Sequence, residues 1–228
     1  MNRKKIVVLT GAGMSAESGL KTFRDSDGLW ENHRIEDVAT RMAWESNMQL
    51  VLDFYNQRRK DVLNAEPNAG HKAIVKLEER FDVTVITQNI DDLHERAGSS
   101  NVMHLHGEIL KARSTADSHL LYDWRKDISP GDMCEKGSQL RPHIVWFHEP
   151  VPMIELAQKE TTKADILIVV GTSLQVYPAA GLILYAPQFA KKFLIDPKIP
   201  DVSYVRNITC IARKASDGME ALLNDLMN

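Results

Sequence analysis

The sequence predicts an α/β fold in which a parallel sheet is covered by helices on both faces. Short runs rich in valine, isoleucine and leucine recur along the chain and alternate with segments of helical pattern. Several of these runs are almost continuously apolar, as strands buried on both faces are. A glycine-rich segment directly follows the first run. The alternation is typical of βαβ units and therefore of a parallel sheet.

Seven strands and three helices are predicted in chain order. The predicted strands span residues 5–10, 82–88, 101–105, 143–147, 165–171, 191–196 and 208–212. The predicted helices span residues 48–64, 68–80 and 217–227. Asn68, which follows Pro67, can cap the second of these helices.

Two stretches do not fit the alternation, and we expect them to form a small module. Residues 25–66 are helical and polar-aromatic, whereas residues 109–141 are irregular and rich in turn residues. The sheet domain would then comprise residues 1–24, 67–108 and 142–228 of one domain that spans residues 1–228. A cleft between a sheet and an inserted module is a common place for a ligand.

Composition excludes several classes of partner. The chain of 228 residues has a formal net charge of -3 and no basic block, which argues against nucleic acid and membrane surfaces as partners. No stretch approaches the roughly 20 apolar residues of a membrane span. The two cysteines, Cys134 and Cys210, cannot form a disulfide framework, so we expect a cytoplasmic protein. The sequence leaves the oligomeric state open.

The segment after the first predicted strand matches the pattern G-x-G-x-x-G/A. It consists of Gly11, Ala12, Gly13, Met14, Ser15 and Ala16. Glycines there allow a tight turn and let backbone N–H groups approach a pyrophosphate, which the dipole of a following helix would favour. Taken alone, the pattern is also compatible with a strand-to-helix turn that binds nothing. No acidic residue clearly ends a second strand about 20 residues further on, which disfavours a plain dehydrogenase.

Four further motifs follow the glycine loop in a fixed order. They are TFRD at residues 22–25, TQNID at 87–91, HLHGE at 104–108 and GTSLQVYPAA at 171–180. Together with the loop GAGMSAESG, this set closely resembles the sirtuins, which are NAD-dependent protein-lysine deacylases. The resemblance runs from about residue 5 to about residue 215. It implies a Rossmann-like sheet domain with a small module made of two insertions, NAD as co-substrate, and acylated-lysine proteins or peptides as partners.

The resemblance assigns the nicotinamide end of NAD to four residues. Asp91 and the backbone at Ile90 are expected to bind the carboxamide. Phe23 is expected to shield the nicotinamide pocket, and Arg24 to lie near the phosphates or the ribose. The pyrophosphate would lie at the glycine loop, where the cofactor-binding residues are Gly11, Ala12, Gly13 and Ala16.

His106 is the expected general base of the reaction. Cleavage of the bond from nicotinamide to ribose C1′ leaves oxocarbenium-like character, so the site must orient a weak nucleophile, the substrate's acyl oxygen. His106 would then accept a proton from a ribose hydroxyl, because imidazole titrates near neutral pH. Gln88 and Asn89 would hold the ribose, with Asn89 counted as catalytic. We expect His104 to be structural and His71 to be an ordinary helix residue.

Further nucleotide contacts are expected after the later strands. Gly171, Thr172 and Ser173 follow an apolar strand, where short hydroxyls can meet phosphate or ribose oxygens. Asp196 stands where the family usually has asparagine against the adenine ribose, and an aspartate can still accept from hydroxyls. Ala215 matches the late adenine-side position.

The predicted helix 48–64 carries the strongest indication of the acyl group. Tyr55 and Arg58 share one helix face and resemble the Tyr-x-x-Arg pair of sirtuins that remove malonyl, succinyl or glutaryl groups. A guanidinium grips a carboxylate bidentately, and a phenol adds a third hydrogen bond. The alternative is a solvated arginine beside a packed tyrosine. Val145 and Phe147 are expected to bind the substrate peptide, in a segment where the family normally has glycine in place of His148.

Most sirtuins hold a structural zinc with four cysteines, whereas the corresponding region here contains Cys134 alone. We therefore expect no zinc, with the module held by the packing of Leu120, Leu121, Tyr122 and Trp124, and we expect Cys210 to be buried. The alternative functions are mainly deacetylation, ADP-ribosyl transfer, or NAD binding without turnover.

Overall fold

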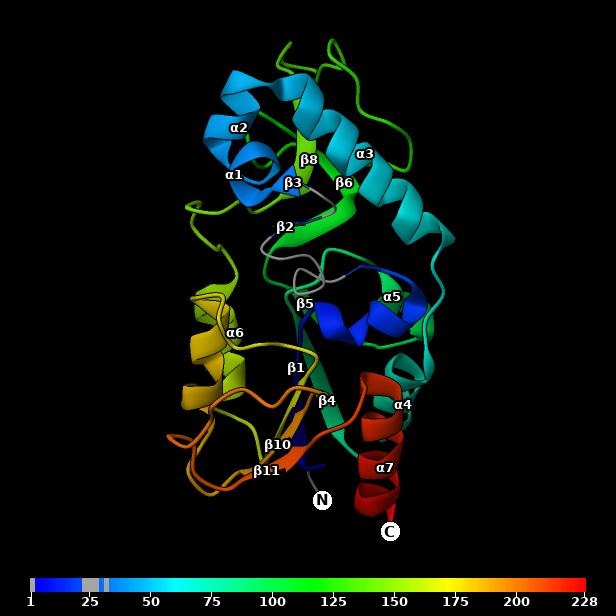
Figure 1. Cartoon of the computed structure of the whole chain (residues 1–228), viewed down its shortest axis with the longest axis vertical. Helices are drawn as coiled ribbons and strands as arrows, with labels where there is room; N and C mark the ends of the chain where they lie inside the picture. The colour runs from blue at the N-terminus through cyan, green and yellow to red at the C-terminus, as the bar shows by residue number, and fades with distance from the viewer. Residues whose placement is uncertain (1–2, 22–28, 31–32) are drawn as a thin grey trace.

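A six-stranded parallel sheet forms the centre of the protein. The computed structural model describes residues 3–21, 29–30 and 33–228. The strand order is β11-β10-β9-β1-β4-β5, and every neighbouring pair is parallel (Figure 1). The strands are β1 (Lys5–Thr10), β4 (Asp82–Thr87), β5 (Val102–His104), β9 (Ile166–Val170), β10 (Lys191–Ile195) and β11 (Ile208–Ile211). The predicted α/β class is confirmed.

The strand order reverses between β1 and β9. The chain runs outward from β1 to β4 and β5, and later returns to place β9 on the other side of β1. Thr10, the last residue of β1, pairs with Val170, the last residue of β9. In open parallel sheets, ligands bind outside the carboxyl ends of the strands at such a reversal. The glycine loops that follow Thr10 and Val170 therefore lie at the expected binding position.

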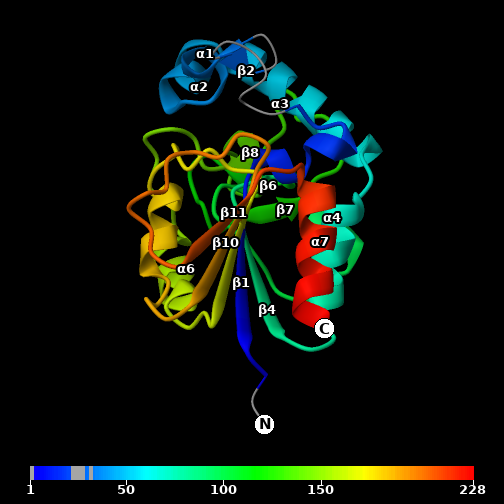
Figure 2. The ribbon, with the colours of Figure 1, turned by 60° about the horizontal axis from the view of Figure 1, so that its bottom comes forward.

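Helices cover both faces of the parallel sheet (Figure 2). On one face lie α4 (Ala69–Leu77) and α7 (Ala215–Met227), and on the other lie α6 (Ile154–Thr161) and the 3₁₀ segment η3 (Ala179–Tyr185). Ile6 and Val8 of β1 join the first core, which includes Met219 of α7. Val7 and Leu9 join the second core. Burial of both faces explains the unbroken apolar run of β1.

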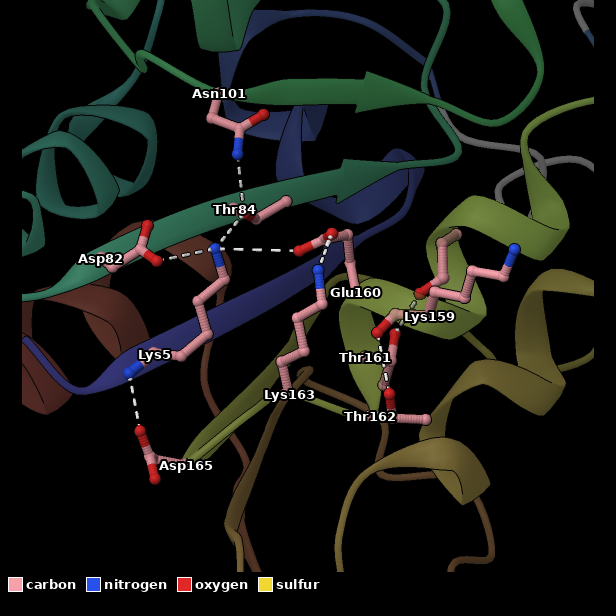
Figure 3. Close-up of polar contacts among 11 residues, drawn as sticks. Lys5, Asp82, Thr84, Asn101, Lys159, Glu160, Thr161, Thr162, Lys163 and Asp165 are labelled. Atoms are coloured by element: carbon pink, nitrogen blue, oxygen red, sulfur yellow. Dashed lines mark hydrogen bonds and ion pairs between the residues drawn. The ribbon is translucent and has the colours of Figure 1, made fainter. Parts of the chain in front are cut away.

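A polar network holds the amino-terminal edge of the sheet (Figure 3). Lys5 Nζ lies 3.0 Å from Asp82 Oδ2 and 2.7 Å from Thr84 Oγ1, and 3.9 Å from Glu160 Oε2 of α6. The Lys5 backbone N–H donates to Asp165 Oδ2 at 2.7 Å. Only 14% of the Lys5 side chain is exposed, so its charge needs these partners. This network lies at the opposite end of β1 from the glycine loop.

The remaining elements form what we call the small module (Figure 1). Within the described residues it contains a three-stranded antiparallel sheet of order β7-β6-β8, a two-stranded antiparallel sheet of β2 and β3, and three helices. The elements are β2 (Leu29–Trp30), β3 (His33–Arg34), α1 (Ile35–Val38), α2 (Arg41–Ser46), α3 (Met48–Asn64), β6 (Gly107–Ser114), β7 (Leu121–Asp123) and β8 (Leu140–Ile144). The domain boundaries expected from the sequence remain a prediction.

One expectation about this region is wrong in part, and another is wrong. Residues 109–141 are irregular over most of their length, as expected, but β6 and β7 also lie in this stretch and pair with each other. The predicted strand 143–147 does not join the parallel sheet, because β8 ends at Ile144 and pairs antiparallel with β6. The sequence pattern hid this pairing because polar side chains interrupt these strands and only part of each is apolar.

An apolar cluster fills the part of the small module that contains Cys134. Leu52, Ala112, Ile128, Cys134 and Leu140 form its buried core, and Leu120, Tyr122 and Trp124 pack against it. The inward packing expected of Leu121 is wrong, since this residue is 45% exposed. Alternation along β7 turns Tyr122 inward and its two neighbours outward.

The side chain of Asn56 fastens α3 to the loop before β8. Its Nδ2 donates to the Ile128 carbonyl at 2.9 Å, and its Oδ1 accepts from the Ile128 N–H at 2.9 Å. Cys210, which we expected to be buried, is exposed because β11 is the edge strand of the parallel sheet. None of the helices within the described ranges is long and apolar enough to cross a membrane.

Candidate functional site

The loops after β1 and β9 pack backbone against backbone. The Gly13 N–H donates to the Gly171 carbonyl at 2.8 Å, and the Gly11 N–H donates to the Val170 carbonyl at 3.0 Å. A Cβ on Gly13 would lie 2.7 Å from the Cα of Gly171. Gly171 itself has a φ of +63°, and a Cβ there would lie 2.3 Å from the backbone nitrogen of Met14. These glycines are therefore required by the contact between the loops as well as by any ligand.

The glycine loop does not lead into an α-helix as expected. The loop instead contains one 3₁₀ turn, η1 (Ala12–Met14), and continues into a second, η2 (Ala16–Ser18). Such short turns cannot supply the dipole of a long helix. Ala12 and Ala16 are exposed, which leaves their backbone accessible to a ligand.

Side chains from α4 and from the loop itself hold the glycine loop in place. Asn68 Nδ2 donates to the Met14 carbonyl at 2.9 Å and to Ser18 Oγ at 3.0 Å. Glu17 Oε2 accepts from the N–H of Ser216, in the first turn of α7, at 2.9 Å. Ala215, the first residue of α7, is buried beside this contact.

Ser15 links the glycine loop to the TQNID motif. Its hydroxyl donates to Asp91 Oδ2 at 2.9 Å and accepts from Asn89 Nδ2 at 3.0 Å. Burial raises the pKa of Asp91, against hydrogen bonds from the Leu93 N–H and Ser15 that lower it. No role for Ser15 is predicted from the sequence. A hydroxyl side chain between Met14 and Ala16, inside a glycine loop, is the signal that could have pointed to it.

Asn89 is fixed through three of its polar groups. Besides the contact to Ser15, its N–H donates to Thr87 Oγ1 at 3.0 Å, and its carbonyl lies 3.0 Å from His104 Nδ1. The neighbouring Gln88 donates from Nε2 to Thr172 Oγ1 at 3.3 Å. These contacts bring the ends of β4, β5 and β9 together, so that Gln88, Asn89 and Asp91 meet the glycine loop.

His106 lies between β5 and β6 with its Nδ1 3.1 Å from the carbonyl oxygen of Gln88. A carbonyl only accepts, so Nδ1 carries the proton and Nε2 keeps a lone pair. Burial lowers the pKa of His106, although the bond to Gln88 opposes this. His106 is therefore a neutral imidazole at pH 7 with one nitrogen able to accept a proton. Gly107 follows at a φ of +84°, where a Cβ would lie 2.0 Å from the His143 carbonyl oxygen.

Two further histidines are more involved than expected. His104 Nε2 lies 2.8 Å from Glu95 Oε1 of α5 (Leu93–Ala97), while its Nδ1 holds Asn89. His71 is fully buried and closes the capping box of α4, because its Nδ1 accepts from the Asn68 N–H at 3.3 Å. Burial lowers the pKa of His71 to about 4. His71 is thus a buried cap rather than an ordinary helix residue.

The nucleotide contacts expected after β9 and β10 lie at the carboxyl edge of the parallel sheet. Thr172 is buried, and its Oγ1 accepts from the Leu174 N–H at 3.2 Å. Asp196 directly follows β10, is 1% exposed, and accepts from the Lys198 N–H at 2.9 Å. The Gly171 N–H donates to the Ile195 carbonyl at 2.9 Å and so joins the ends of β9 and β10. Ser173 lies half-buried in the same loop.

Tyr55 and Arg58 are both buried on α3. Tyr55 is 0% exposed, and its ring centroid lies 5.0 Å from that of Phe54 and 6.4 Å from that of Trp146. Burial raises the pKa of Tyr55. Only 7% of the Arg58 side chain is exposed, so a solvated arginine is excluded. Arg58 also lines an open pocket of about 510 Å³ between α3 and the loop that includes Lys21.

The segment after β8 is held from several sides. The Val145 N–H donates to the His106 carbonyl at 2.9 Å, and the Phe147 N–H donates to the Ala39 carbonyl at 3.0 Å. Phe147 is 38% exposed. Glu149 accepts from the Trp146 N–H at 2.9 Å and pairs with Arg141 at 2.8 Å. These contacts give the proposed peptide-binding segment a fixed shape next to His106.

His148 occupies a left-handed backbone position with a φ of +69°. A glycine would adopt this conformation without strain, whereas an L side chain rarely does. This conformation explains why a glycine is expected at this position from the resemblance. The histidine that stands here instead carries backbone strain.

Two expected site residues, Phe23 and Arg24, lie outside the described residues. Within the described part of the chain, no group of three histidine, cysteine or acidic residues could hold a metal ion. Cys134 donates from Sγ to Ser114 Oγ at 3.3 Å inside the apolar cluster. The donor set present does not fit a tetrahedral zinc site.

Comparison with known proteins gives consistent matches. The model of the Sir2 family matches residues 11–178. An NAD-dependent protein deacylase of Helicobacter pylori is 51% identical over 224 residues, which cover 98% of each chain. A protein of the same name from Bacteroides thetaiotaomicron is 51% identical over 226 residues and covers 96% of each chain.

Solved structures agree with this assignment. A Sir2 homologue in complex with NAD superimposes with a TM-score of 0.89 at 39% identity, covering 99% of this chain and 90% of that one. A Sir2 protein with a p53 peptide and NAD+ superimposes with a TM-score of 0.83 at 28% identity, covering 99% and 94%. On the sequence match, the curated relatives and the shared fold, the chain belongs to the Sir2 family.

Proposed function

We propose that this protein is an NAD-dependent protein-lysine deacylase that prefers succinyl, malonyl and glutaryl groups and also accepts acetyl. The observation that carries the chemistry is the convergence of His106 with Gln88, Asn89 and Asp91 at the strand reversal. The partners would be acylated-lysine proteins or peptides, as the family's chemistry implies.

NAD acts in this proposal as a co-substrate. The glycine loop, in which Ala12 and Ala16 are exposed, would take the pyrophosphate, Ser173 would meet phosphate or ribose oxygens, and Asp196 would meet the adenine ribose. Asp91 is buried, and its carboxyl group would accept from the carboxamide NH₂ of the leaving nicotinamide. The side chain of Asn89 is fixed by Ser15 and would orient the ribose without further rearrangement.

The acyl oxygen of the substrate would attack ribose C1′ as the bond to nicotinamide breaks. His106 Nε2 would then accept the proton of a ribose hydroxyl, which closes onto the acyl carbon. Hydrolysis gives free lysine and O-acyl-ADP-ribose. Burial keeps His106 neutral, which is the state that a general base requires at the start of this step.

The acyl preference rests on Tyr55 and Arg58. Arg58 places a guanidinium with little access to water on the same helix face as the phenol of Tyr55. A guanidinium can bind a carboxylate through two parallel hydrogen bonds, which a methyl group cannot accept, so a charged acyl group would add to the ion pair that Arg58 already makes with Asp61 at 4.0 Å. An acetyl group would leave this end of the pocket unfilled.

The decisive experiment supplies NAD with matched acetyl- and succinyl-lysine peptides and follows nicotinamide and O-acyl-ADP-ribose. His106→Ala is expected to abolish both products. Arg58→Met is expected to reduce succinyl turnover about tenfold or more while acetyl turnover stays within about twofold, since only the charged acyl group needs the guanidinium. Arg41→Met removes an exposed arginine from the same module and is the matched control.

Each alternative predicts a different result. Turnover of acetyl peptide alone would make the protein mainly a deacetylase, and equal losses of both activities in Arg58→Met would remove the acyl role of Arg58. ADP-ribosylated protein without O-acyl-ADP-ribose would favour ADP-ribosyl transfer. A protein that binds NAD but releases no nicotinamide would contradict the proposal.

We further propose that the protein works in the cytoplasm without zinc, and that neither nucleic acid nor membranes are its partners. The formal net charge of -3 and the two isolated cysteines support this. Activity is expected to survive EDTA. Loss of activity in EDTA and its recovery on adding zinc would contradict the zinc-free proposal.

A further inference from the structure

His104 bridges a carboxylate and the backbone of Asn89. Its Nε2 lies 2.8 Å from Glu95 Oε1, and its Nδ1 lies 3.0 Å from the Asn89 carbonyl oxygen. The His104 side chain is 9% exposed, against 40% for Glu95. His104 ends β5 and Glu95 lies on α5, so the bridge joins two elements at the edge of the catalytic site.

Both partners of His104 are acceptors. A carbonyl oxygen and an ionised carboxylate have no proton to give, so each ring nitrogen must donate for both bonds to form. The arrangement therefore requires the imidazolium. Burial acts to lower the pKa of His104, but the hydrogen bond to Glu95 and its charge outweigh burial, so the pKa is raised above its ordinary 6.5.

Loss of one proton from His104 would break one of the two bonds. The bond to Glu95 is the charge-assisted one and is the stronger of the two. A neutral His104 therefore keeps its proton on Nε2, which leaves the Nδ1 lone pair facing the Asn89 carbonyl oxygen. Two lone pairs then repel each other at Asn89, whose side chain donates to Ser15 Oγ, and Ser15 in turn donates to Asp91.

We propose that His104 is a positioning residue: its imidazolium, paired with Glu95, holds the backbone of Asn89 for turnover and releases it at alkaline pH. This inference rests on the role proposed above for Asn89. Through Asn89 Nδ2, the constraint reaches Ser15 and the glycine loop.

The other charged groups around His104 do not replace Glu95. The charge of Glu108 of β6 also raises the pKa of His104, but less than that of Glu95, and Glu108 is itself paired with Lys111 at 2.8 Å. The charge of His104 also lowers the pKa of Asp91, whose carboxylate accepts a hydrogen bond from Ser15. His94 is buried, and burial together with the neighbouring histidines holds its pKa well below its ordinary value, so it stays neutral.

The two histidines of the HLHG motif then give the pH profile of kcat/KM an acid limb, set by His106, and an alkaline limb, set by His104. The pKa of His106 is lowered, and activity appears as the pH rises through it because the neutral base is needed. The pKa of His104 is raised, and activity is lost as the pH rises through it because the imidazolium is needed. A bell-shaped profile of kcat/KM is expected from these opposite shifts.

The test measures kcat and the peptide KM against pH by varying the acylated peptide at saturating NAD. Glu95→Gln keeps an acceptor for Nε2 but removes the charge, and is expected to move the alkaline limb down by about one pH unit while the acid limb stays in place. His104→Asn keeps a donor toward Asn89 that does not titrate, and is expected to remove the alkaline limb. His104→Leu is expected to lower kcat about tenfold with little change in peptide KM.

Glu66→Gln is the matched control, because Glu66 also pairs with a residue of α5, namely Arg96, at 2.9 Å. It is expected to leave both limbs unchanged. An alkaline limb that stays at the wild-type pH in both Glu95→Gln and His104→Asn would overturn the inference. If these variants fail to fold, histidine NMR on the wild-type chain decides the matter, since a pKa of His104 at or below 6.5 contradicts it and a higher value supports it.

Failure of this inference is distinguishable from failure of the proposed function. If His106→Ala and Asn89→Ala keep wild-type turnover, the proposed function is wrong. If both are inactive while Glu95→Gln has the wild-type alkaline limb, only the positioning role of His104 is wrong.

Discussion

Replacement of Asn56 by alanine is expected to lower the free energy of unfolding by about 3 kcal/mol. Asn56 is 8% exposed and makes three hydrogen bonds, two to the backbone of Ile128 and one from Arg59 Nη1 at 2.7 Å. Ile128 and Arg59 are each 1% exposed, so their polar groups would lose a partner away from water.

The magnitude follows from these three orphaned groups. Each buried group that loses its partner costs about 1–3 kcal/mol, and partial access of water favours the low end of that range. Burial lowers the pKa of Arg59 only to about 10, so its charge persists at pH 7 and still needs Asn56. A loss of about 3 kcal/mol corresponds to a fall in Tm of about 6–12 °C for a chain of this size.

Urea unfolding followed by circular dichroism measures the change, with EDTA present so that no metal contributes. Asn64→Ala is the matched control, because Asn64 is an exposed residue at the end of the same helix. It is expected to change the free energy of unfolding by less than about 0.5 kcal/mol. If Asn56→Ala costs no more than the control, the reciprocal bond to Ile128 does not hold the small module together.

Three further changes test other features. His148→Gly is expected to raise the free energy of unfolding by about 0.5–1 kcal/mol in urea titrations, because it relieves the left-handed backbone at a φ of +69°, and a loss of stability would contradict this. Gly171→Ala is expected to cost more than about 2 kcal/mol and to weaken NAD binding by calorimetry, because its Cβ would lie 2.3 Å from the Met14 nitrogen, and unchanged stability would refute the close approach. Acid titration is expected to destabilise the fold between about pH 6.5 and pH 4 through His71. In this range the unfolded chain protonates His71 at its ordinary pKa of 6.5, whereas the folded chain, with a pKa of about 4, keeps it neutral. The loss amounts to about 3 kcal/mol, and His71→Gln should flatten it; an equal slope in that variant would assign the loss to other groups.

Much of the fold could be predicted because local pattern and tertiary environment agree. The unbroken apolar run of β1 requires burial on both faces, and the sheet provides it with neighbours β4 and β9. Helix α3 was predicted with its observed ends, since Asn47 caps its first turn and Ala65 ends it in an extended conformation. The small antiparallel sheet was missed because all three of its strands are partly polar and β7 and β8 are also short. Their sequences show no clear alternation, and only the pairing between them makes them strands.

The candidate site divides in the same way. His106, Asn89 and Asp91 lie in motifs that can be recognised from the sequence alone. The structure places them at one edge of the sheet, together with the glycine loop. The contributions of Ser15 and His104 were not readable. Each acts through a contact with a residue distant in sequence, and no local pattern encodes such a contact.

The sequence by itself determined the parallel α/β class, the family resemblance and the choice of candidate site residues. Composition, hydrophobic period and motif order are properties of the chain, and they can be read without coordinates. Only the tertiary structure decided which nitrogen of His106 faces an acceptor, why the pKa of His104 is raised and why Gly171 is required. These properties depend on which acceptor, carboxylate or backbone atom lies within a few ångströms, and folding alone brings those partners together.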